Sequence, residues 1–130
     1  GVNAAGYVLC WGSGVPTPPS SLFASVSISD IHGCGLRLDG TLECWGSPMA
    51  IDDTVVYQDV SSGGGGYCAV RADGVAVDCE IPARTWDDDA PVLAYGATNM
   101  FKYVSVAADV DGGACVWYED ETVYCWGSAW

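Results

Sequence analysis

The chain has 130 residues, of which seventeen are acidic and four are basic, so its formal net charge is −13. A charge of this sign repels phosphate backbones, which excludes nucleic acid as an expected partner. Half of the residues are hydrophobic, which is sufficient for a core, but no apolar run reaches the roughly 18 residues that a membrane-spanning helix requires.

The N-terminal segment overlays on the second half of a repeated pattern that is complete further along the chain. Cys10-Trp11-Gly12 corresponds to Cys44-Trp45-Gly46. The cysteine that would pair with Cys10 falls one position before Gly1, so we expect the chain to be part of something longer. Cys10 is then an orphan, completed by an upstream cysteine or an intermolecular bridge, or left as a free thiol.

The full pattern occurs three times: an aromatic residue, then Val-Ser, a Cys, a turn containing Asp, and a second Cys. The copies begin at Phe23, Tyr57 and Phe101. An Asp follows the first Cys at the same distance in each copy, at Asp39, Asp73 and Asp120. Repeats spaced by roughly 35 to 45 residues are typical of arrays, solenoids and propellers, in which units bury their apolar faces by stacking.

These repeats predict the following organisation within one structural array. Residues 1–14 are the second half of an incomplete repeat, and residues 15–47 are a repeat with a linker. Residues 48–80 are a repeat, and residues 81–130 are a repeat with a long acidic loop at 81–100. The connecting segments are rich in Pro, Gly, Ser and Asp, which favour turns.

Each complete copy predicts a β-hairpin, because apolar and polar residues alternate on both sides of the turn. Asp39-Gly40 and Asp73-Gly74 lie midway between two cysteines, where a two-residue turn requires positive φ and Asp-Gly is well suited. The third copy has Glu121 in place of the glycine, so we expect a longer or differently shaped turn there.

Six of the seven cysteines flank these hairpins, where two cysteines can face each other across adjacent strands. The predicted disulfides are Cys34–Cys44, Cys68–Cys79 and Cys115–Cys125. Structural zinc sites favour Cys-x-x-Cys spacings with His, whereas this chain has no such spacing and one His, so zinc is disfavoured. Disulfides imply an oxidising compartment and therefore an extracellular or secreted protein.

The run from Phe23 to Gly46, with His32-Gly33-Cys34, Asp39-Gly40 and Cys44-Trp45-Gly46, resembles a repeat of the RCC1-like superfamily in its short, cysteine-bearing extracellular form. The resemblance implies an all-β protein built from four-stranded propeller blades, usually seven. Three and a half copies are too few for that ring, so we expect a partial or open array of antiparallel blades with hairpin disulfides. The resemblance implies a scaffold and not a chemistry.

Residues of catalytic type do not form a convincing set. Ser29, Asp30 and His32 are close neighbours in sequence, and a structural role for His32 fits the repeat pattern better. The glycine run 63–66 lacks the Lys and Ser or Thr of a phosphate loop. We expect the tryptophans that follow a cysteine to pack in the core or on the disulfides, namely Trp11, Trp45 and Trp126.

Two segments are candidates for ligands or modification. The cluster Trp86, Asp87, Asp88 and Asp89 is a candidate loop for a calcium ion, a glycan or another subunit, although it lacks EF-hand spacing. The second segment is a candidate for O-glycosylation, with linker rigidity as the alternative explanation. Its residues are Thr17, Ser20 and Ser21 with Pro16, Pro18 and Pro19.

These features predict a non-enzymatic extracellular structural protein, the protomer or a segment of a surface fibre, filament or matrix joined by inter-repeat β contacts. Its expected partners are itself or adjacent repeats of a longer chain, and glycans. The alternative is a secreted or receptor-ectodomain binding module that recognises a protein or carbohydrate. No catalytic residue, resident metal or other cofactor is predicted, apart from the candidate calcium loop.

Overall fold

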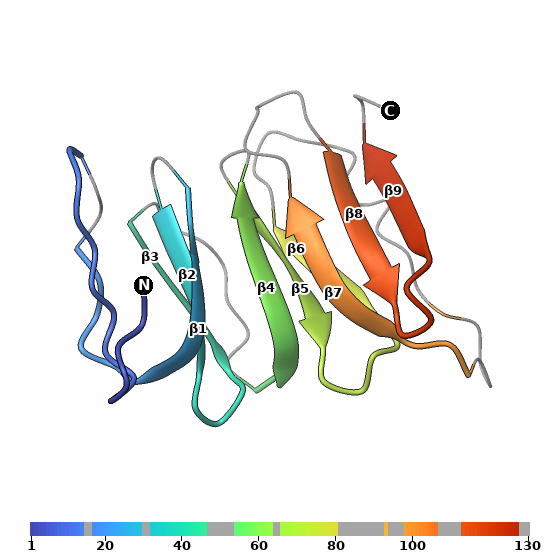
Figure 1. The fold of residues 1–130 in the computed structure, drawn as a ribbon, viewed down its shortest axis with the longest axis horizontal. Coiled ribbons are helices and arrows are strands. Elements are labelled where there is room, and N and C mark those ends of the chain that lie inside the picture. The colour runs from blue at the N-terminus through green and yellow to red at the C-terminus, as the bar shows by residue number, and fades with distance from the viewer. Residues whose placement is uncertain are drawn as a thin grey trace.

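Strands dominate the computed structural model, which describes residues 1–14, 17–29, 32–46, 54–63, 66–80, 93, 98–106 and 113–127. The described strands form three separate three-stranded antiparallel sheets that stand side by side along the molecule (Figure 1). Sheet 1 contains β1 (Phe23–Ile28), β2 (His32–Arg37) and β3 (Leu42–Gly46). Sheet 2 contains β4 (Tyr57–Gly63), β5 (Gly66–Arg71) and β6 (Val77–Glu80). Sheet 3 contains β7 (Phe101–Val106), β8 (Gly113–Tyr118) and β9 (Val123–Gly127).

The pairing of the strands follows the same pattern within each of the three sheets. The two cysteines of each predicted pair lie directly opposite each other on the second and third strands. All three pairs are disulfide-bonded, with Cα–Cα distances of 4.1, 4.0 and 4.0 Å. The register of each first strand shifts immediately after its leading aromatic residue, at Phe23, Tyr57 and Phe101. The predicted antiparallel all-β architecture with hairpin disulfides is therefore confirmed.

The predicted turn geometry was wrong in two respects. In sheet 1 the hairpin is closed between Arg37 and Thr41, and only the glycine of Asp39-Gly40 has positive φ, at 86°. This is a three-residue loop and not the two-residue turn expected from Asp-Gly. In sheet 3 Glu121 adopts the same conformation, with φ of 70°, and the hydrogen bonds from Tyr118 and Glu121 repeat those of sheet 1.

The longer turn is in sheet 2. There Arg71 donates its N–H to the Ala76 carbonyl, one residue further along than in the other two sheets. The expected change of shape at Glu121 did not occur, because the loop constrains only the φ of this residue, and the side chain lies in solvent. A non-glycine residue tolerates this conformation at a moderate energetic cost.

A short hairpin within residues 1–14 lies against sheet 1. Val2 and Val8 make an isolated antiparallel bridge, and the amino group of Gly1 donates to the Leu9 carbonyl at 2.8 Å. Val8 packs in a cluster with Phe23 and Trp45. We call residues 1–14 the N-terminal hairpin.

The core lies between the sheets in two further clusters. The cluster between sheets 1 and 2 contains Cys34, Leu36, Leu42, Tyr57, Val60, Tyr67 and Ala69. The cluster between sheets 2 and 3 contains Cys68, Val70, Val77, Phe101, Val104, Val106, Ala114, Val116 and Trp126. Each sheet thus buries one face against its predecessor, and sheets 1 and 2 bury their other face against their successor, as stacked repeats require.

Two further expectations need correction. The resemblance implied four strands per blade, whereas each sheet has three within the described residues, and Val56 makes only an isolated bridge to Thr41 of the preceding sheet. Trp45 and Trp126 are buried as expected, but Trp11 is 80% exposed. The back face of sheet 1, which holds Trp45, is covered by the N-terminal hairpin, and nothing in the described residues covers Trp11 in the same way.

Gly40 provides a test of this packing, because a Cβ atom there would meet Val56 Cγ1 at 2.6 Å in addition to adopting positive φ. Gly14 also has positive φ, but a Cβ atom there would meet nothing within 4 Å. We expect Gly14→Ala to lower the free energy of unfolding by about 1–2 kcal/mol, and Gly40→Ala to lower it by at least about 1 kcal/mol more, because the β-branched Val56 side chain has few χ1 rotamers with which to relieve the contact. Urea unfolding measures both, and equal losses would contradict the packing at this junction.

Candidate functional site

The junctions between successive sheets are built from one repeated backbone contact. The leading aromatic residue of each sheet donates its N–H to the carbonyl of the positive-φ glycine in the preceding hairpin. The distances are 2.7 Å from Phe23 to Gly6, 2.8 Å from Tyr57 to Gly40 and 2.9 Å from Phe101 to Gly74. The N-terminal hairpin thus makes the same contact with sheet 1 that sheets 1 and 2 make with their successors.

A second contact joins the first strands of neighbouring sheets. The Ser62 N–H donates to Ser27 Oγ at 2.9 Å, and the Val106 N–H donates to Ser61 Oγ at 3.0 Å. Ser27 and Ser61 occupy the same position, the fifth residue of β1 and of β4. The recurring Val-Ser pair in the sequence therefore marks a serine that accepts a hydrogen bond from the next sheet.

Sheet 2 adds two side-chain contacts to sheet 3. Asp59 Oδ2 accepts the Val104 N–H at 2.8 Å, and Gln58 Nε2 donates to the Phe101 carbonyl at 2.7 Å. Burial raises the pKa of the Asp59 carboxyl above its ordinary value, and the hydrogen bond from the Val104 N–H opposes this shift in part. The junction between sheets 2 and 3 is thus closed by backbone and side-chain hydrogen bonds together.

The polar pairs that join the second and third strands also differ between the sheets. In sheet 2, Arg71 Nε bonds Asp78 Oδ2 at 2.8 Å, and the Tyr57 hydroxyl donates to the same oxygen at 2.8 Å. Burial, and next the hydrogen bond to Asp78, raises the pKa of Tyr57. Sheet 1 has the equivalent pair Arg37 and Glu43, at 3.0 Å.

Sheet 3 has tyrosines at both of these positions, Tyr118 and Tyr124. The ion pairs of sheets 1 and 2 are partly exposed, so each contributes little to stability. Their replacement marks sheet 3 as chemically different from the other two sheets.

One face of sheet 3 is not covered by another sheet within the described residues. We call it the open face of sheet 3, and it corresponds to the faces of sheets 1 and 2 that receive the next sheet. Val123 is 49% exposed, whereas its counterparts Leu42 and Val77 are 1% and 4% exposed. The remaining residues of the open face are Lys102, Tyr103, Ser105, Cys115, Trp117, Glu121 and Cys125.

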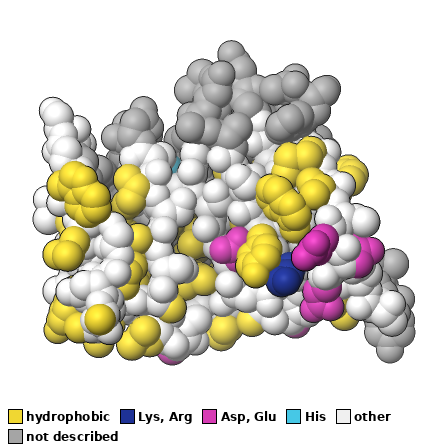
Figure 2. All heavy atoms as spheres, viewed as in Figure 1, with side chains coloured by type: hydrophobic (Ala, Val, Ile, Leu, Met, Phe, Trp, Pro, Cys, Tyr) yellow, Lys and Arg dark blue, Asp and Glu magenta, His cyan; other side chains and the backbone are white. Residues whose placement is uncertain are grey.

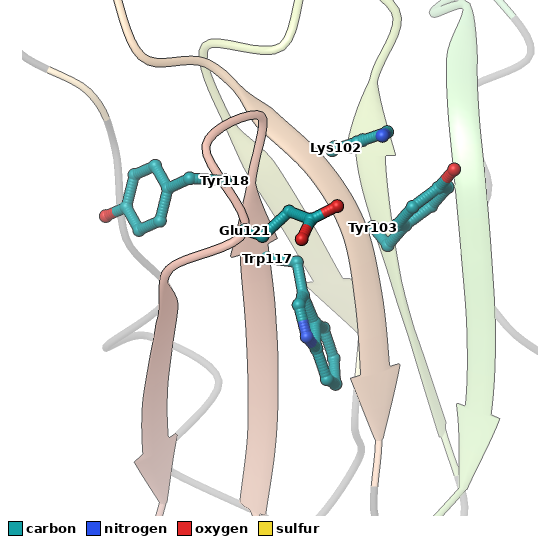
Figure 3. Close-up of a pocket in the computed structure, with 5 residues that line it drawn as sticks. All are labelled: Lys102, Tyr103, Trp117, Tyr118 and Glu121. Carbon is teal, nitrogen blue, oxygen red and sulfur yellow. The ribbon is translucent and has the colours of Figure 1, made fainter.

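The open face contains a hollow of about 500 Å³. Lys102, Tyr103, Trp117 and Glu121 line it, while the Tyr118 ring points away from them (Figure 3). Lys102 Nζ lies 5.1 Å from the centre of the Tyr103 ring, a cation–π contact. Hydrophobic, basic and acidic side chains gather over this part of sheet 3 on the molecular surface (Figure 2). The hollow combines aromatic surface with one charge of each sign.

The other predicted site residues are distributed as follows. Cys10 is a free thiol that is half-buried in the N-terminal hairpin. Thr17 and Ser20 are exposed, while Pro18, Pro19 and Ser21 are half-buried, and glycosylation there stays a prediction. Pro16 and the loop Trp86, Asp87, Asp88 and Asp89 lie outside the described residues. His32 is buried, with Nδ1 2.7 Å from Ser29 Oγ.

The described residues contain no group of three or more His, Cys, Asp or Glu side chains arranged to hold a metal ion. Within the same part of the chain, no helix is long and apolar enough to cross a membrane.

Sequence reasoning missed the junction residues Gln58 and Asp59 and the open-face residue Lys102. They follow the leading aromatic residue, but their types differ from copy to copy, so the repeat alignment gives no signal for them. The serines could have been found, because Ser27, Ser61 and Ser105 recur at one position of the pattern. A recurring polar residue in a lead strand indicates a recurring partner.

Solved structures similar to this one include two receptor-kinase ectodomains. The CRINKLY WD40 ectodomain of the Arabidopsis thaliana receptor kinase ACR4 matches 97% of this chain and 45% of its own, with a TM-score of 0.75 and 18% identity. The ectodomain of the Physcomitrella patens receptor kinase CR4 matches 90% of this chain and 34% of its own, with a TM-score of 0.68 and 19% identity.

The chain therefore spans less than half the length of each of these two structures. No protein-family model matches the sequence, and no match is found among curated proteins. At these identities the likeness shows the fold, which is that of β-propeller repeats. The three sheets are stacked in the manner of propeller blades.

The two junction serines allow a matched test with Ser105, which occupies the same position on the open face and is exposed. Ser61→Ala leaves the Val106 N–H without its acceptor in a half-buried setting, so we expect the free energy of unfolding to fall by about 1–2 kcal/mol. Ser105→Ala should change it by less than about 0.5 kcal/mol. Chemical unfolding of the two variants measures this difference, and a similar loss in both would show that the serine acts within its own sheet.

Proposed function

We propose that the chain is a non-enzymatic extracellular structural protein, an array of RCC1-like repeats that forms a segment of a surface fibre or matrix. The observation that carries this proposal is the junction hydrogen bond, which is repeated at all three boundaries between 2.7 and 2.9 Å. A junction that recurs unchanged allows sheets to be added one after another, which is how repeat arrays grow. The function would then lie in the stacking of the sheets.

The disulfides support the extracellular part of this proposal. Each sheet is closed by its own cross-strand disulfide, and such bonds persist in oxidising compartments. Each bond constrains one hairpin, so an array can resist local opening outside the cell. The net charge of −13 keeps such an array soluble until it is assembled.

The proposed units of the array are residues 1–14, 15–47, 48–80 and 81–130. Their proposed partners are adjacent repeats or further copies of the chain. Glycans on the exposed Thr17 and Ser20 would lie on the linker before sheet 1. The acidic loop at 86–89 is proposed as a calcium or subunit contact on its composition alone.

A second candidate function is a binding module of the receptor-ectodomain type. The observation that favours it is the likeness of the fold to the ectodomains of two plant receptor kinases. In this case the hollow lined by Tyr103, Trp117, Lys102 and Glu121 would contact a protein or carbohydrate ligand, because aromatic surface with a few polar groups is typical of such sites.

Immunogold labelling of the cells that make the protein, with antibodies raised against the purified chain, separates these functions. We expect label on fibres or matrix outside the plasma membrane, in material that is solubilised only by denaturant with reductant. Label confined to the plasma membrane, in material that detergent alone extracts, would favour the receptor-type module. Label inside the cell would contradict both proposals.

A further inference from the structure

The open face of sheet 3 retains the polar groups through which the other sheets receive a successor. The Glu121 carbonyl follows the same hairpin geometry as the carbonyls of Gly6 and Gly40, each of which accepts the N–H of a leading aromatic residue. Glu121 also retains their positive φ, at 70°. A fourth acceptor is therefore present at the position where three equivalent acceptors are occupied.

Two side chains of β7 match those that make the remaining polar contacts at the other junctions. Ser105 is the fifth residue of its strand, as are Ser27 and Ser61, whose Oγ atoms accept an N–H from the next sheet. Lys102 is the second residue of its strand and aligns with Gln58, whose Nε2 donates to the carbonyl of the next leading aromatic residue. Lys102 Nζ is a donor of the same kind.

The apolar part of the face is also retained. Cys115, Trp117 and Val123 occupy the positions of Cys68, Val70 and Val77, which are 0%, 0% and 4% exposed beneath sheet 3. Cys115 and Trp117 are only half-buried, and Val123 is half exposed. An apolar face with an aligned set of donors and acceptors is the surface that a further sheet requires.

Glu121 differs from the equivalent residues of the other junctions, which are glycines, because it has a side chain. A Cβ atom on Gly40 would meet Val56 Cγ1 at 2.6 Å, and one on Gly74 would meet Met100 Cβ at 2.9 Å. Val56 and Met100 are the residues immediately before the leading aromatic of the incoming sheet. Gly6 is less confined, because a Cβ atom there would meet Leu22 Cβ at 3.4 Å, an ordinary contact. Glu121 has a Cβ atom at this position, so an incoming sheet that approaches as sheets 2 and 3 do would be crowded by the residue that corresponds to Val56 or Met100.

We propose that the open face of sheet 3 docks a further three-stranded sheet of this repeat type, and that this sheet carries Gly immediately before its leading aromatic residue, or Ala where it approaches as Val56 approaches Gly40. The inference deepens the proposed function, on which it rests, by naming the partner of one face. The residues at this position in the present chain are Leu22, Val56 and Met100. Val56 and Met100 would be crowded by Glu121, and sheet 1, which follows Leu22, is already covered by the N-terminal hairpin, so a sheet from a second copy of the chain is the poorer partner.

An extended chain tests this inference. A second copy of residues 47–80 is appended after Trp130. Sheet 2 is chosen because the residue at the Trp117 position beneath it is Leu36, which is larger than Val70, the residue at that position beneath sheet 3. One version keeps valine at the copied position 56, and a second carries alanine there. A third keeps the valine and adds Glu121→Gly. All versions carry Cys10→Ser, and peptide mapping without reduction confirms that the added hairpin has formed its own disulfide.

The readout is hydrogen exchange at the amide of the copied Tyr57, which is expected to donate to the residue-121 carbonyl. We expect this amide to exchange at least about tenfold more slowly in the alanine and Glu121→Gly versions than in the valine version. Adding Ser105→Ala to the alanine version should reverse part of this protection, although it has little effect in the unextended chain. Equal protection in all three versions would overturn the role of Glu121.

Two further outcomes would overturn the docking itself. One is rapid exchange of the copied Tyr57 amide in every version although the added disulfide has formed. The other is concentration-dependent dimerisation of the unextended Cys10→Ser chain that Val123→Asp abolishes, because a second copy would then be the partner of this face. Neither outcome depends on where the protein is found, so failure of the inference and failure of the proposed function are distinguishable.

Discussion

The hydrogen bond from the leading aromatic N–H to the carbonyl of the preceding hairpin fixes the arrangement of the whole structure. The carbonyl can be presented in this way because the residue that carries it has positive φ, at Gly6, Gly40 and Gly74. The same residue must lack a side chain where the next sheet packs closely. One position of the hairpin therefore sets the strand path, the acceptor and the space available to the next sheet.

The disulfides and the stacking support each other. Cys34 and Cys68 are fully buried beneath the following sheet, so each bond closes a hairpin and also provides part of the surface on which the next sheet rests. A single small sheet has too little apolar surface to be stable alone, and stacking together with cross-links compensates for this. The stability of each sheet therefore depends on its neighbours as well as on its own disulfide.

The repeat pattern was sufficient to predict the strands, the cysteine pairs and the stacked all-β arrangement, because these depend on alternation and spacing within each copy. It was not sufficient for the turn at Glu121, since residue type alone predicts a changed loop where the backbone in fact keeps its shape. The junction contacts of Gln58 and Asp59 join residues about 45 positions apart and vary between copies. Only the arrangement of the sheets in space reveals such contacts.

Native-state hydrogen exchange at the amides of Tyr57, Phe101 and Val106 tests the central claim most directly, because each donates across a boundary between two sheets. If the junctions hold the array together, these amides should exchange as slowly as those of Cys34 and Cys68, opposite their disulfide partners on β2 and β5, through the same cooperative opening. Exchange as fast as that of exposed amides in the N-terminal hairpin would contradict the account, because the sheets would then open independently of one another.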